Sequence, residues 1–238
     1  MIFRFAGTAI GNARLAQAEA LRCNMLGRRR KLSRLSKSAL FLVVMLAISA
    51  GAGSPPSDSS GVQQILDDSS PLSDVTILII RHAEKPGSGS GLSVEGAARA
   101  RTYVRYFQNF RIDSQPLRLD YLVAADDSEH SQRSRLTLEP LAEAIGLKPD
   151  LRFQASQPRM LARELQSRAH GKAILICWHH KGIPELLEAL GANPERLLPH
   201  GEWPGEQFGW VLQLQFDGRG HLIRGKSKRI KEHLMPGD

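Results

Sequence analysis

The sequence predicts an α/β fold: a single doubly wound, mostly parallel sheet with helices on both faces and a C-terminal β-hairpin at its edge. Short apolar runs rich in Val and Ile alternate with longer segments whose apolar residues recur at helical spacing. Strands that are covered on both faces read as unbroken apolar runs, as residues 75–80 and 173–177 do. Hydrophobic residues make up 42% of the 238 residues, an ordinary fraction for a globular core.

The net charge of +8 belongs to the N-terminal region. Residues 1–38 contain nine Lys and Arg against Glu19 alone, whereas residues 39–238 contain 23 residues of each sign. The folded part of the chain is therefore electrically balanced. This excludes a broad face for nucleic acid or another polyanion on the domain itself.

Residues 1–53 are predicted to be a signal peptide or a signal anchor. A basic run at 28–31 precedes the apolar run at 39–50, and small residues follow in AISAGAGS. An apolar run of about a dozen residues is shorter than the roughly 20 that a membrane-spanning helix needs. We therefore expect cleavage near residues 50–53 and export to the periplasm or the exterior, with an uncleaved membrane anchor as the alternative. Met25 would open a signal of ordinary length, and we expect translation to start there.

The segment that follows is predicted to be a flexible linker. Residues 54–73 are rich in Ser, Pro and Asp, so the folded domain is expected to cover residues 74–238. Cys23 lies in the segment to be removed and Cys177 is left alone, so the mature chain can form no internal disulfide. Cys177 falls in an apolar run, where we expect a buried and inert thiol.

The first half of the domain is predicted to hold two strands and two helices. The strand at 75–80 leads into a glycine-rich loop at 85–91, which lacks the Gly-Lys-Ser/Thr ending of a P-loop and is expected to be a mobile lip. Ser93 is the expected N-cap of the first helix, and Gly146 is expected to end the second. The first helix has Ala97, Ala100, Val104 and Phe107 at helical spacing. It is followed by a predicted strand at 119–125 and by the second helix at 131–145.

The second half continues the alternation and ends in two strands. Pro184 in the first turn and Gly191 just past the end mark a short helix at 183–190. Asp217-Gly218 is the turn signal of a hairpin that joins strands at 208–216 and 221–225. The remaining predictions are a helix at 159–168 behind Pro158, a strand at 172–178 and a solvated strand in the basic tail at 225–233.

Some conspicuous residues have an ordinary structural interpretation. Arg99, Arg101 and Arg105 on the first helix could bind an anionic partner, but a solvated helix face is the expected role. Trp203 and Trp210 could line a pocket, but aromatic residues beside a hairpin more often pack in the core.

Basic side chains follow two of the predicted strands at the point where each strand ends. Arg81-His82 comes after the first strand and His179-His180 after the strand at 172–178. Arg133 falls in the first turn of the second helix, close to the same strand ends. Because ligands of open α/β sheets bind beyond the carboxyl ends of the strands, this arrangement indicates an anionic substrate.

Three blocks of the sequence, in order, resemble one family. RHAE (81–84) resembles the RHG-type signature of the histidine phosphatase superfamily, which has the phosphoglycerate mutase-like fold. QRSRLTLEPLAEAIGL (132–147) is similar to its second block, and ILICWHHKGIPELLEALG (174–191) to its third. The resemblance spans residues 75–191 and implies a phosphoryl-transfer enzyme.

The resemblance also implies roles for individual residues. His82 would be the nucleophile that becomes phosphohistidine, and Arg81, Arg133 and His179 would form the phosphate pocket. The step of four residues from Arg133 to Thr137 selects Arg133 over Arg135. The distance back from Leu186-Leu187 favours His179 over His180, although both histidines remain candidates.

The chemistry of these side chains agrees with that implication. A transferred phosphoryl group spreads negative charge over its oxygens, and two guanidinium forks with an imidazolium stabilise that charge without a metal or cofactor. A neutral imidazole is a competent nucleophile, and covalent capture divides one hard displacement into two easier ones.

The proton donor is left open among four carboxyl groups. Glu84 leads because it stands two residues past His82, and Asp126, Asp127 and Glu129 are rivals on the loop that leads to Arg133. The sequence lacks the His-Asp pair of phytase-like acid phosphatases. It also lacks the Ser and Asn that follow the first histidine in glycolytic mutases, so neither specific identity is predicted.

The predicted function is a metal-independent phosphatase that hydrolyses a phosphomonoester on a small molecule. Loops such as 85–91 and 194–207 would set its specificity. A phosphoglycerate mutase-like phosphotransferase is one alternative, disfavoured by export, and a non-catalytic module that binds phosphate or a phosphoprotein is another. A metal hydrolase with His82, Glu84 and His179-His180 as ligands is disfavoured because Arg81 and Arg133 would repel the cation.

Overall fold

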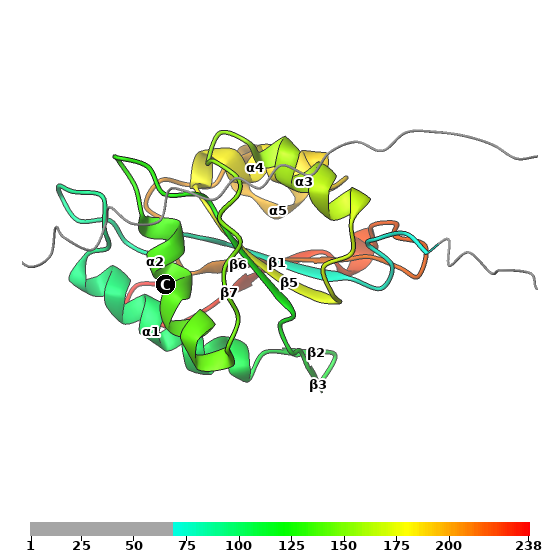
Figure 1. Ribbon diagram of the computed structural model, residues 1–238, viewed down its shortest axis with the longest axis horizontal. Coiled ribbons are helices and arrows are strands. Elements are labelled where there is room, and N and C mark those ends of the chain that lie inside the picture. Colours follow the sequence, from blue (N-terminus) through cyan, green and yellow to red (C-terminus); the bar gives the residue numbers. More distant parts are fainter. Residues whose placement is uncertain (1–68) are drawn as a thin grey trace, which may run out of the picture. The chain divides into compact units, whose positions relative to one another are not determined.

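The computed structural model describes residues 69–238, so the predicted signal segment and most of the predicted linker lie outside the described residues. A five-stranded sheet in the order β4-β5-β1-β6-β7 forms its centre (Figure 1). Strand β1 is parallel to β5, β5 is parallel to β4, and β6 is antiparallel to both β1 and β7. The strands are β1 (Thr76–Arg81), β4 (Tyr121–Ala124), β5 (Ala173–Trp178), β6 (Trp210–Gln215) and β7 (Lys228–Lys231), with a separate ribbon of β2 (Arg111–Ile112) and β3 (Gln115–Pro116).

Helices cover both faces of the sheet, as predicted. Helices α1 (Val94–Gln108) and α2 (Arg133–Ile145) lie on one side, and α3 (Pro158–Ser167), α4 (Ile183–Ala189) and α5 (Pro194–Leu197) lie on the other (Figure 1). Short 3-10 turns are η1 (His180–Gly182), η2 (Pro199–Gly201) and η3 (Arg224–Lys226). Strand β1 sends alternate side chains into the two cores, Ile77 and Ile79 into one and Leu78 and Ile80 into the other. This two-sided burial is why the strand reads as an unbroken apolar run.

The predicted helix ends are confirmed in α1 and α2. The Ser93 side chain accepts a hydrogen bond from the backbone N–H of Gly96 at 3.0 Å, which caps α1. Gly146 has a φ of 71° and ends α2 in the left-handed conformation, where glycine is favoured. Cys177 is buried, and burial raises the pKa of its thiol, in agreement with an inert role.

The predicted C-terminal hairpin is correct in its turn but wrong in its second strand. Gly220 donates to the Asp217 carbonyl at 2.8 Å, and Phe216 and Leu222 form an isolated bridge. The chain then enters η3, and the strand that pairs along β6 is Lys228–Lys231. These exposed basic residues suit an edge strand, since charge on an edge discourages pairing with another chain. The prediction of a solvated strand in the basic tail is thereby confirmed.

The prediction for Arg99 is wrong. Arg101 and Arg105 are exposed, but the Arg99 side chain lies on the buried face of α1 with 3% of its surface accessible. The reason is a set of carboxylates from other parts of the chain, because Arg99 forms ion pairs with Glu84, Glu232 and Asp238 at 2.7, 3.1 and 2.6 Å. Trp203 and Trp210 are buried in the core, as expected.

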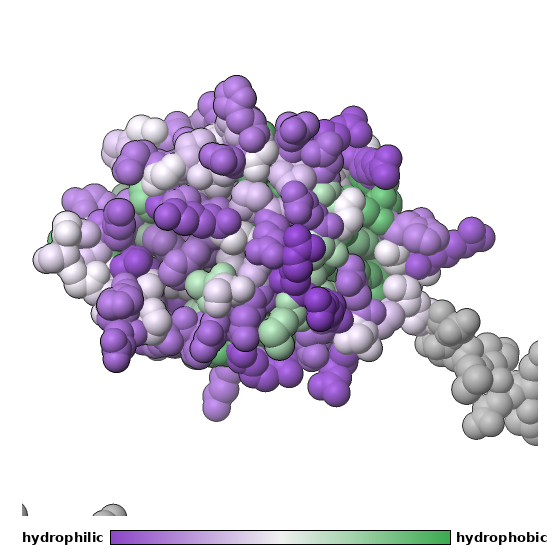
Figure 2. Space-filling model, turned by 90° about the horizontal axis from the view of Figure 1, so that it is seen from above, coloured by the Kyte–Doolittle hydropathy of each residue, from purple (hydrophilic) through white to green (hydrophobic). Residues whose placement is uncertain are grey.

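The surface over α3 and α4 is mainly hydrophilic, with hydrophobic residues visible only in patches (Figure 2). Within residues 69–238, no helix has the length and apolar character that crossing a membrane would require.

Candidate active site

Two histidines are brought together where β1 and β5 end. Arg81 pairs in register with Trp178, and the backbone N–H of His82 donates to the Trp178 carbonyl at 3.0 Å. The residues that follow the two strands are therefore neighbours. The ring centroids of His82 and His179 lie 5.1 Å apart in an edge-to-face arrangement.

A cavity of about 250 Å³ opens beside these rings. Its lining consists of guanidinium, ammonium and imidazole side chains, and no carboxylate takes part. The residues are Arg81, His82, Lys85, Arg133, His179, His180 and Lys181. Such a lining is suited to an anion and unsuited to a cation.

Hydrogen bonds orient the His82 ring. Its Nδ1 lies 2.7 Å from the Ala83 carbonyl oxygen, which can only accept, so we assign the proton to Nδ1. Nε2 then keeps its lone pair. The Ala83 N–H donates to Thr137 Oγ1 at 2.9 Å, and that hydroxyl donates to the Arg133 carbonyl at 2.7 Å. Thr137 thus couples the His82 segment to the first turn of α2.

Arg81 is held by the loop that precedes β6. Its Nη1 donates to the carbonyl oxygens of Pro204, Gly205 and Gln207, and its guanidinium carbon lies 3.9 Å from the centre of the Phe208 ring. The residue is 1% exposed, yet its Nε has no hydrogen-bond partner among the described residues. A buried donor left unpaired is costly, which is typical of a group reserved for a ligand.

Arg133 presents a second guanidinium group to the same cavity. It begins α2, and its Nη1 makes long hydrogen bonds to the carbonyl oxygens of Gly89 (3.4 Å) and His130 (3.3 Å). Its Nε is also buried and lacks a partner within residues 69–238. The neighbouring Arg135 instead pairs with Asp127 at 2.8 Å.

Burial and neighbouring positive charge keep both imidazoles neutral. Burial, and then the charges of His179, Arg81 and Arg133, lower the pKa of His82 to about 3. Burial, and then the charges of Arg133, His180 and Arg81, lower the pKa of His179 to about 4. Burial also lowers the pKa of Arg81 to about 10, which leaves it charged at neutral pH. A neutral His82 beside two cations is what nucleophilic attack on a phosphate requires.

We expect the folded protein to lose stability as the pH falls below about 6.5, the ordinary pKa of His82. Between that value and the folded pKa of about 3, the unfolded chain binds a proton that the folded chain excludes, so acid favours unfolding. At pH 5 the contribution of His82 is roughly 2 kcal/mol. Denaturant unfolding at pH 7 and pH 5 measures it, and His82→Gln should lose less stability than the wild type. An equal loss in both proteins would contradict a pKa lowered by burial.

The carboxyl groups considered as proton donors lie outside the cavity lining. Glu84 Oε1 accepts from Arg99 Nε at 2.9 Å and from Arg99 Nη2 at 2.7 Å. Asp127 is paired with Arg135, and Asp126 accepts a hydrogen bond from the Asp127 N–H. The fourth candidate, Glu129, is exposed.

Sequence reasoning missed several residues of the site. Ser131 is buried, and its Oγ lies 3.5 Å from His179 Nε2. Glu206 lies on the loop that holds Arg81, and among nearby groups its charge acts most strongly to raise the pKa of Arg81. Lys85 and Lys181 line the cavity. Lys85 and Lys181 are adjacent in sequence to predicted site residues, which could have indicated them, whereas no spacing rule links Glu206 to the strand ends.

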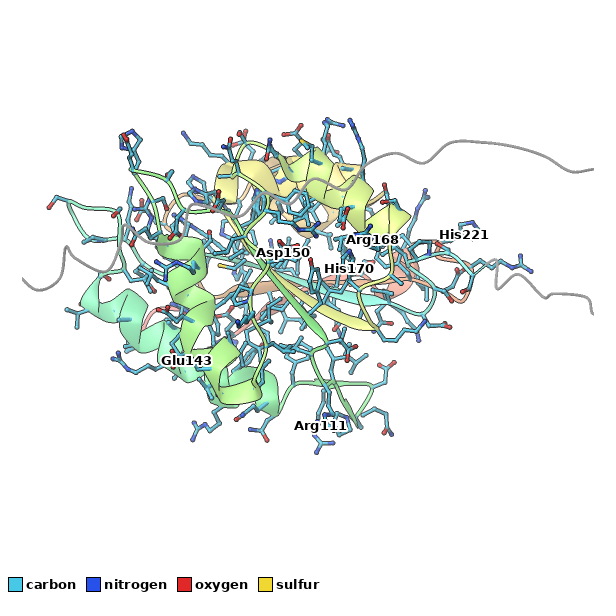
Figure 3. The ribbon with its side chains drawn as sticks, in the orientation of Figure 1. Arg111, Glu143, Asp150, Arg168, His170 and His221 are labelled. Carbon is cyan, nitrogen blue, oxygen red and sulfur yellow. The ribbon has the colours of Figure 1, made fainter. Side chains whose placement is uncertain are left out.

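The described residues offer no ready metal site. Within 69–238, no group of three or more His, Cys, Asp or Glu side chains is placed to hold a metal ion. His170 and His221 lie at the opposite end of the sheet, where the parallel strands begin (Figure 3). In the cavity itself, Arg81 and Arg133 lie beside His82 and His179 and would repel a metal cation.

No family model matches the chain, and no curated protein matches its sequence. Solved structures do resemble it. The protein histidine phosphatase SixA complexed with tungstate is 14% identical, with 66% of this chain and 97% of that chain covered and a TM-score of 0.40. A putative phosphohistidine phosphatase SixA from Agrobacterium tumefaciens is 19% identical, with 63% and 96% covered and a TM-score of 0.44.

A phosphoglycerate mutase from Plasmodium falciparum is 13% identical, with 70% of this chain and 96% of that chain covered and a TM-score of 0.44. These structures belong to the superfamily that the three sequence blocks resemble. At 13% to 19% identity, this likeness is one of fold.

Proposed function

We propose that this protein is a phosphatase of the histidine phosphatase superfamily, which hydrolyses a phosphomonoester through a phosphohistidine on His82. One observation carries the proposal. Arg81, His82 and Arg133 line one small cavity whose lining contains no carboxylate, and the Nε groups of both arginines are buried without a hydrogen-bond partner among the described residues. Guanidinium groups bind phosphate through charge-assisted hydrogen bonds, so a bound phosphoryl group supplies the acceptors that these donors lack.

In the first step, His82 Nε2 attacks phosphorus. The Nε2–P bond forms while the bond from phosphorus to the ester oxygen breaks, and the departing oxygen takes a proton from a general acid. Arg81 and Arg133 stabilise the charge on the equatorial oxygens. The Ala83 carbonyl oxygen, which accepts a hydrogen bond from His82 Nδ1–H, stabilises the positive charge that develops on the ring.

In the second step, water attacks the phosphohistidine. The new O–P bond forms as the Nε2–P bond breaks, the carboxylate left by the first step takes the proton of the water, and inorganic phosphate departs. His179, edge-on to His82 at 5.1 Å between ring centroids, takes a proton from solvent when the charge of the bound phosphate offsets that of the nearby arginines, and then donates a hydrogen bond to a phosphoryl oxygen.

We propose Glu206, in place of Glu84, as the general acid. Glu84 is held in an ion pair with Arg99 and Asp127 in one with Arg135, and neither lines the cavity. Glu206 is exposed and stands between Gly205 and Gln207, whose carbonyl oxygens accept hydrogen bonds from Arg81. It also lies outside the cavity lining, but this loop contacts an arginine of the phosphate pocket.

Glu206→Gln should slow the hydrolysis of an alkyl phosphate by roughly 100-fold, because an alkoxide must be protonated as it leaves. An aryl phosphate with a good leaving group should be affected far less. The kcat values of the wild type and the variant with each substrate measure this difference. Glu202→Gln, on the same loop, is the matched control. Equal losses for both substrates, or the same leaving-group dependence in Glu84→Gln, would refute the assignment.

Turnover of p-nitrophenyl phosphate by the purified protein, with and without a chelator, tests the proposed function as a whole. We expect hydrolysis that survives chelation and is inhibited by orthophosphate, since two arginines supply the positive charge that a metal would otherwise supply. Activity that disappears on chelation and returns with a divalent metal would replace the proposal by a metal hydrolase.

Two other functions are separated by the same assay. A mutase-like phosphotransferase would pass the phosphoryl group to an added alcohol or sugar phosphate in preference to water. A binding module would bind orthophosphate without releasing nitrophenol from any phosphomonoester. Hydrolysis is favoured because the cavity is open to water and Lys85 and Lys181 at its mouth are exposed.

We also propose that the phosphatase acts outside the cytoplasm, on the strength of the basic and apolar segments at 28–50. N-terminal sequencing of the protein recovered from its host should give a first residue near 51–54. A chain that starts at Met1 or Met25 would exclude cleavage.

A further inference from the structure

The cavity beside His82 holds more positive charge than a single phosphoryl group needs. Arg81 and Arg133 supply two guanidinium groups, and Lys85 and Lys181 add two ammonium groups. A phosphate ester carries about two negative charges at neutral pH. The two arginines already balance these charges, so the two lysines remain available for something else.

The two lysines approach the cavity from different loops. Lys85 begins the glycine-rich loop after β1, and Lys181 lies in η1 after β5. Both are exposed, and neither makes an ion pair or a side-chain hydrogen bond with any residue between 69 and 238. Two unpaired ammonium groups that converge on one cavity favour an additional anion there.

His180 lines the same cavity as these ammonium groups and is next to Lys181 in sequence. After burial, the charges of Arg81, Lys181 and Lys85 lower its pKa, whereas the charge of Glu206 raises it. His180 Nδ1 is buried and has no hydrogen-bond partner within the described part of the chain, which leaves it available to a ligand.

We propose that Lys85, Lys181 and His180 form a second anion subsite, and that the substrate is a small molecule with a second phosphate a few bonds from the one transferred to His82. This inference rests on the proposed phosphatase function. A cavity of about 250 Å³ limits the two phosphates to a short separation. A phosphoprotein, which presents one phosphate on an extended chain, would leave the lysines unpaired.

Binding of two probes that the enzyme does not hydrolyse tests the subsite. Methylenebisphosphonate and orthophosphate are titrated calorimetrically into the wild type, the Lys85→Met/Lys181→Met double variant and the control Lys228→Met, which changes an exposed lysine of β7. We expect the wild type and the control to bind the bisphosphonate roughly tenfold more tightly than orthophosphate. The double variant should lose most of that preference while its orthophosphate affinity changes by less than about threefold.

Two results would overturn the subsite. In the first, the wild type binds the bisphosphonate no more tightly than orthophosphate. In the second, the double variant keeps the wild type's preference for the bisphosphonate. If orthophosphate binds and p-nitrophenyl phosphate is hydrolysed, such a result refutes the subsite alone. If neither phosphate probe binds and no ester is hydrolysed, the proposed function fails together with it.

Discussion

His82→Asn should reduce the turnover of any phosphomonoester by roughly 10⁴-fold or more, because removal of a covalent nucleophile leaves only binding and electrostatic stabilisation. Asparagine is a polar side chain of similar size, but it has no basic nitrogen that could attack phosphorus. Steady-state kinetics with p-nitrophenyl phosphate measure the loss. Calorimetric titration with orthophosphate should show an affinity within a few-fold of the wild type, since Arg81 and Arg133 remain.

His170→Asn is the matched control for this change. His170 lies at the end of the sheet where the parallel strands begin, far from the cavity (Figure 3). Its ring stacks on Tyr121 and takes no part in the cavity lining, so its replacement should leave kcat within about twofold of the wild type even if some stability is lost. A His82→Asn protein that retains a tenth of the activity would mean that another group attacks phosphorus.

Arg99→Met should lower the free energy of unfolding by about 3–5 kcal/mol, because it leaves buried carboxylates without their cation. The Glu232 side chain is fully buried and accepts from Arg99 Nη1 at 3.1 Å and from the Tyr103 hydroxyl at 3.0 Å. Burial raises the pKa of Glu232 and the charge of Arg99 opposes that rise, so the charged carboxylate depends on the arginine. The loss is a large part of the 5–15 kcal/mol that stabilises a typical domain.

Urea unfolding of Arg99→Met beside Arg101→Met measures this effect. Arg101 lies two residues further along the same helix and is exposed, so its replacement should change the free energy of unfolding by less than about 0.5 kcal/mol. If the free energies of unfolding of the two variants differ by less than about 1 kcal/mol, the Arg99 ion pairs contribute little to stability. The same variant also releases Glu84, which lies two residues after His82, so we expect turnover to fall along with stability.

The sequence was sufficient for the sheet and its helices because their signals are local. The β-branched run of β1, the Ser93 cap and the Gly146 terminus each depend on neighbours a few residues away. The strand ends then brought Arg81-His82 and His179 to one edge by the general geometry of parallel sheets. The second strand of the C-terminal pair was misplaced because a turn signal predicts a reversal and not the length of chain before pairing resumes.

The burial of Arg99 could not be predicted because its partners are distant in sequence. Glu232 and Asp238 meet it only when the C-terminal segment packs against α1, and Glu84 meets it from the loop that follows β1. A lone arginine on an amphipathic helix gives no sign of such partners.

The hydrogen-bond partners of Arg81 could not be predicted either, because they too are distant in sequence. The carbonyl oxygens that hold it come from residues 204–207, a loop without periodicity or a recognisable turn motif. The choice of proton donor stays a prediction. Proximity in sequence favours Glu84, whereas our proposal of Glu206 depends on a loop that contacts Arg81 only in the folded chain.

The most direct test of the central claim is the detection of a phosphoryl group on His82 during turnover. The protein is mixed with p-nitrophenyl phosphate, quenched within milliseconds into alkali, in which phosphohistidine survives, and digested for mass spectrometry. The account predicts a phosphorylated peptide that contains His82, lost on treatment with acid and missing from His82→Asn. Rapid turnover with no phosphorylated His82, or with the phosphoryl group on a different residue, would contradict it.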